Sequence, residues 1–98
     1  MTKLSAGKKR LLDYLGKPYR AMIIDLENCV YCDLGDYDIE ISGGKTIRAD
    51  FDIYVWNKKE LRIIEKHMGV KNDLPSIKEL LESIRNKYSV IAEMAQSV

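Results

Sequence analysis

The stretch Tyr37-Asp38-Ile39-Glu40-Ile41-Ser42 alternates apolar and polar residues without a break. A period of two predicts a β-strand with one buried face and one exposed face. The same alternation is present in residues 20–30 upstream and in residues 47–56 downstream. The connections between these segments are rich in glycine and aspartate, so the sequence predicts an antiparallel meander.

The register of the second hairpin follows from which residues can be buried together. A three-residue loop over residues 43–45 places Ile41 opposite Ile47 and Tyr37 opposite Phe51. A two-residue loop instead places apolar residues opposite acids, because a slip of one residue moves every side chain to the other face. We therefore expect the three-residue loop.

Helix signals flank the strands. Ser5 is a typical N-cap residue for a helix over residues 6–15, which ends at Gly16. Pro75 and Ser76 begin a second helix. The apolar residues of this second helix have helical spacing: Ile77, Leu80, Leu81, Ile84, Tyr88 and Ile91.

Residues 57–69 allow two interpretations. Asn57 and Glu60 have the spacing of a capping box, which favours a helix, but the same residues suit a turn into a fourth strand. In either case the 98 residues predict a single α+β domain over residues 1–98, with an N-terminal helix, a three- to four-stranded antiparallel meander and a long C-terminal helix packed on one sheet face.

The apolar runs of the chain are too short to span a membrane, and residues 1–7 lack an apolar stretch of signal-peptide length. We therefore expect a cytoplasmic protein with no membrane partner.

The net charge of +1 conceals a separation of charge along the chain. Residues 1–20 carry +5, residues 21–57 carry −6 and residues 58–98 carry +2. A basic arm beside an acidic middle favours association with charged partners.

The expected register gathers acids on the polar face of the sheet. It places Asp38 opposite Asp50, and like charges opposite each other destabilise a strand pair. It also places Asp36 opposite Asp52 and Glu40 opposite Arg48, and it allows Glu27 opposite Glu40. The acids of this face are Asp25, Glu27, Asp36, Asp38, Glu40, Asp50 and Asp52.

The acidic face has three interpretations. It is a solvated surface, a cation site, or a docking surface for a basic partner. A cation site is disfavoured because acids on neighbouring strands lack the looped geometry of calcium sites. Tyr54 and Trp56 share the face and are typical interface anchors, which favours docking, with the acids mimicking the phosphates of DNA.

Other constellations point to no catalytic residue, metal site or cofactor. Cys29 and Cys32 have the spacing of a zinc half-site, but His67 is the single histidine. No nucleophile has a neighbouring His–acid pair and no glycine-rich phosphate loop is present, so we do not expect an enzyme. The basic residues Lys8, Lys9 and Arg10 offer an alternative nucleic-acid-binding site on the N-terminal helix, unless they are a solvated helix face.

The block Tyr31–Ser42, with the glycine turn and the alternating strand that follow it, resembles small accessory proteins encoded on phages and mobile elements of Gram-positive bacteria. Within that group it is similar to anti-CRISPR inhibitors. The resemblance implies a cytoplasmic, non-enzymatic inhibitor, acting in the bacterial host cell, that occupies the DNA-binding surface of an RNA-guided nuclease. The alternatives are a small nucleic-acid-binding protein, or an antitoxin or immunity protein against a basic nuclease.

Overall fold

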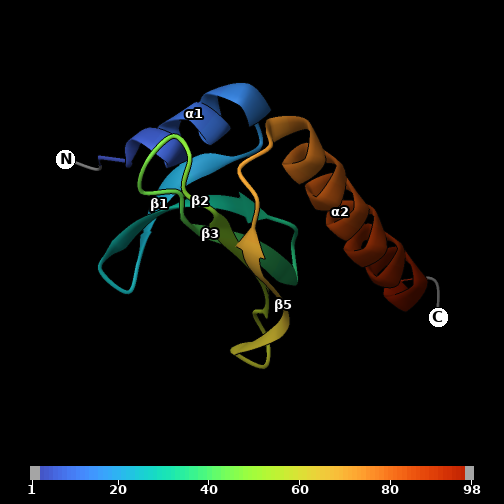
Figure 1. Ribbon diagram of the computed structural model, residues 1–98. Helices are drawn as coiled ribbons and strands as arrows, with labels where there is room; N and C mark the ends of the chain where they lie inside the picture. Colours follow the sequence, from blue (N-terminus) through green and yellow to red (C-terminus); the bar gives the residue numbers. More distant parts are fainter. Residues whose placement is uncertain (1–2, 97–98) are drawn as a thin grey trace.

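The computed structural model describes residues 3–96, with the side chains of residues 3–89 (Figure 1). Along the sequence, one helix precedes five strands and a second helix follows them. The elements are α1 (Ala6–Leu15), β1 (Arg20–Ile24), β2 (Glu27–Asp33), β3 (Tyr37–Gly43), β4 (Phe51–Asn57), β5 (Arg62–Val70) and α2 (Leu74–Gln96).

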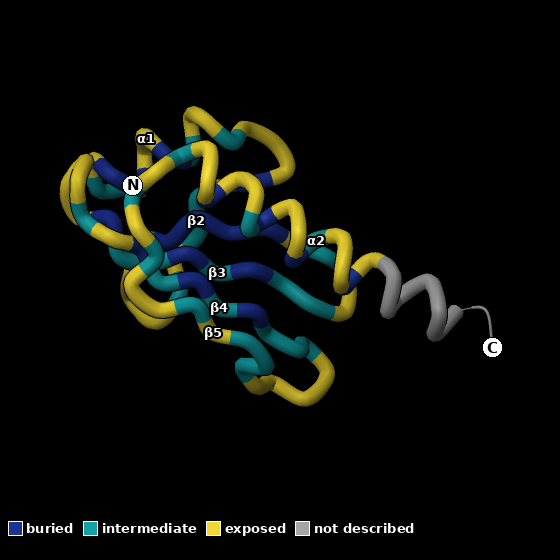
Figure 2. The backbone as a smooth tube through the Cα atoms, turned by 45° about the vertical axis from the view of Figure 1, so that its right-hand side comes forward, coloured by how far each residue is buried: buried dark blue, intermediate teal, exposed yellow. Residues whose placement is uncertain are grey.

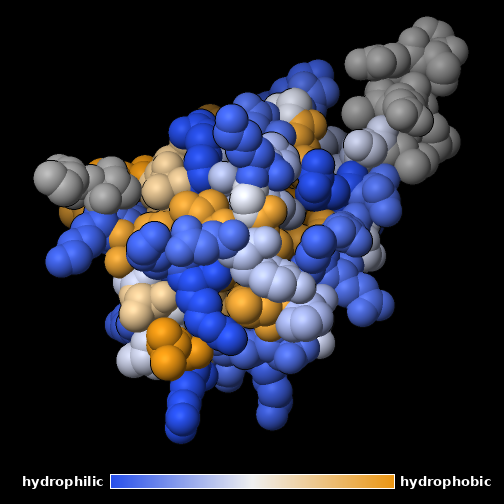
Figure 3. Space-filling model, turned by 90° about the horizontal axis from the view of Figure 1, so that it is seen from above, coloured by the Kyte–Doolittle hydropathy of each residue, from blue (hydrophilic) through white to orange (hydrophobic). Residues whose placement is uncertain are grey.

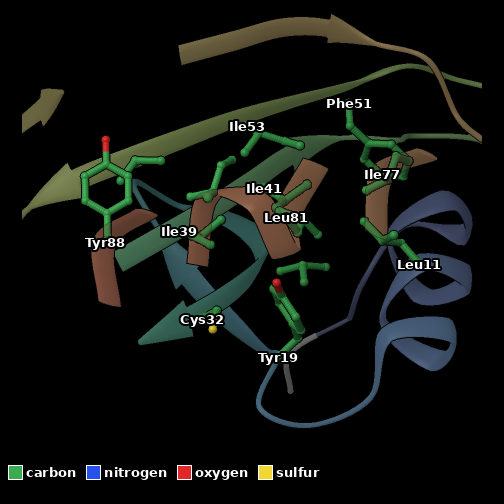
Figure 4. Close-up of a cluster of buried hydrophobic side chains, with 13 residues drawn as sticks. Leu11, Tyr19, Cys32, Ile39, Ile41, Phe51, Ile53, Ile77, Leu81 and Tyr88 are labelled. Carbon is green, nitrogen blue, oxygen red and sulfur yellow. The ribbon is translucent and has the colours of Figure 1, made fainter. Parts of the chain in front are cut away.

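The strands form one antiparallel sheet in the order β1-β2-β3-β4-β5, and both helices pack on the same face of it (Figures 1 and 2). The core lies between the helices and the sheet, where alternate strand residues such as Ile39, Ile41 and Ile53 meet Leu11 of α1 and Leu81 of α2 (Figure 4). The predicted α+β class and meander are confirmed, with five strands instead of three or four. Among the described residues, neither helix has the length and apolar character needed to cross a bilayer.

The segment expected as one strand over residues 20–30 is two strands, β1 and β2. They are joined by Asp25 and Leu26, whose φ angles are 49° and 68°. Positive φ at both central residues is the conformation of a tight type I′ hairpin turn, in which Asn-Gly is usual. Leu26 therefore projects into solvent, 99% exposed, and lies in neither strand.

The expected register between β3 and β4 is wrong. Ile41 lies opposite Ile53, six residues beyond Ile47, and Tyr37 lies opposite Asn57. The connecting loop is residues 44–50, and it packs against α1 at Gly7. The even shift keeps the residues within β3 and β4 on their expected faces and pairs two large β-branched side chains in the core, whereas Ile47 lies in the loop and is 56% exposed.

The close packing of α1 on this loop explains the glycine in the first turn of the helix. A Cβ at Gly7 would lie 2.2 Å from the carbonyl oxygens of Gly44 and Thr46. Ser5 is the N-cap as predicted: its hydroxyl accepts from Lys8 N (3.4 Å) and donates to Gly44 O (2.8 Å).

The segment left open as helix or strand is a turn followed by β5, because Asn57 Oδ1 accepts a hydrogen bond from Glu60 N at 3.0 Å and closes the turn. The second helix begins as predicted near Pro75, with Asp73 accepting from Ser76 N at 3.1 Å. The predicted burial of Ile91 lies outside the described side chains.

Glu65 of β5 joins the sheet to α2. Its carboxylate accepts from Lys87 Nζ at 2.8 Å and from Tyr88 OH at 2.9 Å, and it lies 2.7 Å from His67 Nε2. Burial raises the pKa of this carboxyl, but the three hydrogen bonds outweigh burial and bring the pKa to about 2.

Candidate protein-binding groove

The sheet face opposite the helices, called here the open face, has no covering element among the described residues. Strand alternation places on it Met22, Ile24, Glu27, Cys29, Tyr31, Asp38, Glu40, Ser42, Asp52, Tyr54, Trp56, Ile63 and Lys66. The helix side, by contrast, shows mostly hydrophilic residues with hydrophobic ones between them (Figure 3).

The open face is hollowed into a groove. Two adjoining hollows of about 300 and 360 Å³ share Ile24, Asp25, Glu40 and Trp56. The β1–β2 turn forms one wall, and the β4–β5 turn with Leu61 forms the other. Both turns project away from the helices (Figure 1). The groove is therefore built by two hairpin tips that the strands between them hold apart.

Glu40 and Trp56 occupy the centre of the groove. The indole Nε1–H of Trp56 donates to Glu40 Oε1 at 2.9 Å. Burial is the main cause of a raised pKa at Glu40, and the nearby Asp25 and Glu27 carboxylates raise it further, although the Trp56 hydrogen bond lowers it. The bond fixes the indole ring while leaving part of the carboxylate free.

Asp38 repeats this arrangement one position along the same face. Its carboxylate accepts from Tyr31 OH at 3.1 Å, and its cross-strand neighbour on β4 is Trp56. Burial raises the pKa of Asp38, and the hydrogen bond from Tyr31 offsets part of that increase. Acids on β3 thus lie beside aromatic rings, where they were expected to lie opposite other acids.

All four expected acid-face pairings are wrong, because both hairpin registers differ. Asp38 faces Trp56, Glu40 faces Tyr54 and Asp52 faces Ser42. Glu27 faces Ile24, since β2 begins at the tight turn. The observed acid pair is instead Asp33 with Asp38, between β2 and β3.

Two of the predicted acids do not lie on the open face. Asp36 is exposed in the β2–β3 loop, with its carboxylate 3.6 Å from Lys59 Nζ. Asp50 lies in the β3–β4 loop, in a separate hollow shared with Arg10 and Lys71. Both residues were placed on the acidic face because the strand alternation of the sequence begins before the first residues of β3 and β4.

The remaining predicted residues stay on or beside the open face. Asp52 accepts from Gly69 N at 2.9 Å, and Tyr54 lines the groove. Glu27 is paired with Lys8 Nζ at 3.4 Å. In the described part of the chain, no ion pair forms at Asp25, and the same holds for Asp38 and Glu40.

Sequence reasoning missed Tyr31, Met22, Lys58 and Leu61 as groove residues. Tyr31 is 6% exposed although it belongs to the open face, and the guanidinium of Arg20 lies 5.0 Å from its ring centre. Alternation along β2 could have placed Tyr31 there. Leu61 could not be found, because its place depends on the β4–β5 turn.

The basic residues of α1 do not form one solvent-facing patch. Lys8 is buried and paired with Glu27, contrary to the prediction of an exposed side chain. Lys9 lies 3.1 Å from Asp13 on the same helix, and Arg10 Nη1 donates to Asn72 Oδ1 at 3.3 Å.

Cys29 and Cys32 are both buried free thiols that project to opposite faces of β2. Burial is the main cause of their raised pKa values, and the nearby Glu40 and Glu27 contribute to bring Cys29 to about 12. Among the described residues no three His, Cys, Asp or Glu side chains are grouped for a metal ion.

Comparison of the chain with protein-family models, curated proteins and solved structures finds no match. The chain is an α+β domain with an aromatic and acidic groove on a sheet face that no described element covers.

Proposed function

We propose that this protein is a non-enzymatic inhibitor of anti-CRISPR type. It binds a basic nucleic-acid-binding protein, such as an RNA-guided DNA nuclease, through the groove on the open face. The observation that carries the proposal is the fixed Trp56 ring flanked by Asp38 and Glu40, whose carboxylates have no ion-pair partner among the described residues.

This arrangement complements a basic side chain in two ways. A guanidinium or ammonium group is attracted to the face of an aromatic ring, most strongly to tryptophan. Carboxylates beside that ring accept its N–H groups in charge-assisted hydrogen bonds. Because the acids are half-buried, their attraction for a cation is screened less than at an open surface.

The geometry changes the form of DNA mimicry that the sequence indicated. Asp25, Asp38 and Glu40 cluster around one aromatic centre, whereas Asp36 and Asp50 lie elsewhere. The groove therefore suits a few basic side chains that would otherwise contact DNA phosphates. It offers no continuous row of charges along a whole strand.

The nucleic-acid-binding alternative draws on Lys8, Lys9 and Arg10, and each of these has a partner within the chain. An antitoxin or immunity protein would use the same groove against a basic nuclease. These three functions therefore differ in the partner they predict.

A pull-down with the tagged chain from bacterial host lysate, at low and at high salt, tests the proposal. Recovery of an RNA-guided nuclease that is lost at high salt, and whose DNA cleavage the purified protein blocks, supports it. Recovery of a small basic toxin selects the immunity function and contradicts the proposal. Recovery of nucleic acid alone indicates a binding site on α1 and also contradicts the proposal.

A further inference from the structure

The two edges of the sheet are not equally protected. On β5 the pairing with β4 shifts register at two places, and the strand carries Arg62 and Lys66. Irregular pairing and charged side chains are the usual protection of an edge strand against further pairing. On β1 all five residues pair with β2 in one regular register.

The free edge of β1 is also apolar. Its sequence is Arg20-Ala21-Met22-Ile23-Ile24, and Ile23 is 58% exposed. Isoleucine on an unpaired edge favours addition of another strand. From these features we propose that β1 is a self-association edge, which pairs antiparallel with β1 of a second copy of this chain.

The register of β1 defines how two copies fit. The pair beside a two-residue turn, Ile24 with Glu27, exchanges hydrogen bonds, and bonding then alternates along the strand. Ala21 and Ile23 therefore direct their N–H and C=O groups to the free edge. Only pairing centred on Met22 uses both residues of both copies, with Ala21 of one opposite Ile23 of the other.

Charge supports a second copy as the occupant. Pairing centred on Met22 places Arg20 opposite Ile24 of the second copy, next to its Asp25, at both ends of the junction. Opposite charges at these positions favour the antiparallel orientation. The chain carries a net charge of only +1, so two copies repel each other little.

Pairing of this kind joins two sheets into one and places two grooves on the same face of it. This goes beyond the proposed function, because it needs no other partner. If the proposed function also holds, the dimer presents two grooves to its target, which increases the avidity for repeated basic segments.

Sedimentation equilibrium of the full chain over a wide concentration range tests the edge. We expect a mass of twice 11.3 kDa at high concentration. Ile23→Lys should raise the dimer dissociation constant by about tenfold or more, since tenfold corresponds to about 1.4 kcal/mol, which the loss of a buried isoleucine contact can supply. The control Met68→Lys alters a residue that is 60% exposed on β5 and should have no effect.

Cross-linking tests the register independently of Ile23. In the proposed pairing Met22 of one copy lies directly opposite Met22 of the other, at a separation that suits a disulfide. Ile24 of one copy lies about 13 Å along the strand from Ile24 of the other. Cys29 lies opposite Met22 on β2, so both variants are made in a Cys29→Ser background. Under mild oxidation Met22→Cys should then cross-link and Ile24→Cys should not, while Cys32 stays buried. A chain that is monomeric throughout, a dimer insensitive to Ile23→Lys, or equal cross-linking of both variants overturns the proposal.

Discussion

The Trp56 indole donates its N–H to the Glu40 carboxylate at 2.9 Å across the β3–β4 pair, at the centre of the open face. The bond holds an aromatic ring and an acid in one fixed arrangement, so little side-chain freedom remains to be lost when a basic group binds. The cost of this arrangement is a half-buried carboxylate with a raised pKa.

The first prediction concerns the half-buried carboxylates of Asp38 and Glu40, whose pKa values are raised. Asp38→Asn and Glu40→Gln keep an oxygen acceptor for Tyr31 and Trp56 but remove a charge. Because the folded pKa of each acid is raised, the charged form disfavours folding above that pKa, and the penalty disappears as the pH falls. At pH 7 the free energy of unfolding of the double variant should therefore equal that of the native protein or exceed it by less than about 1 kcal/mol. Thermal unfolding measures this, and a clear loss of stability would show that both charges support the fold.

Glu65 predicts the opposite pH dependence. Its folded pKa of about 2 lies below the ordinary value of 4.5, so its contribution is complete above pH 4.5 and is lost as the pH falls toward 2. Glu65→Gln should lower the free energy of unfolding at pH 7 by about 1–3 kcal/mol. The difference from the native protein should shrink on acidification in urea titrations. A difference that stays constant down to pH 2 would contradict this role for Glu65.

We expect a substitution at Leu26 to stabilise the protein. A non-glycine residue in the left-handed region costs roughly 1–2 kcal/mol, and the side chain of Leu26 is 99% exposed. Leu26→Gly should raise the free energy of unfolding by about 1 kcal/mol in urea titrations. Ile47→Gly is the control, because Ile47 is exposed in a loop without positive φ. Equal effects at both positions would show that the turn is not strained.

We expect a substitution at Gly7 to destabilise the protein. Alanine favours helices over glycine by about 1 kcal/mol, but its Cβ would meet the carbonyl oxygens of the β3–β4 loop at 2.2 Å. We expect Gly7→Ala to lower the free energy of unfolding by about 1–3 kcal/mol net. Lys9→Ala, at an exposed position of the same helix, should change it by less than about 0.5 kcal/mol. Stabilisation by Gly7→Ala would mean that the loop does not approach the helix so closely.

We expect the two buried thiols to react slowly with thiol reagents. Burial and nearby acids raise the pKa of Cys29 to about 12, and burial also raises that of Cys32, so little thiolate forms near neutrality. Ellman's reagent should react with both cysteines at pH 8 only as fast as the protein unfolds, and at once in denaturant. Immediate labelling of the folded protein would contradict the burial of these residues.

Local patterns were sufficient to predict the helices, the α+β class and the side of the sheet on which most site residues lie. Asp38, Glu40, Tyr54 and Trp56 share the open face as expected, because a register shift of even length leaves strand alternation unchanged. The helix starting after Ser5 was predictable from its capping residue alone.

Tertiary contacts decided the rest. The β1–β2 turn has Asp25 followed by Leu26 where a glycine is usual, so residues 20–30 were predicted to be one strand. The β3–β4 loop is held by its packing on Gly7, a contact between distant residues that alternation along one strand cannot show. These two errors produced the four incorrect acid pairings.

Binding through the groove can be tested by comparing two charge-matched double variants as inhibitors of the nuclease recovered in the pull-down. One carries Asp38→Asn and Glu40→Gln in the groove. The other carries Glu79→Gln and Glu82→Gln, at exposed positions of α2. We expect the groove variant to lose affinity by about tenfold or more and the helix variant to bind as the native protein does. Equal affinities for the two variants would contradict this expectation, because binding would then depend on net charge and not on the groove.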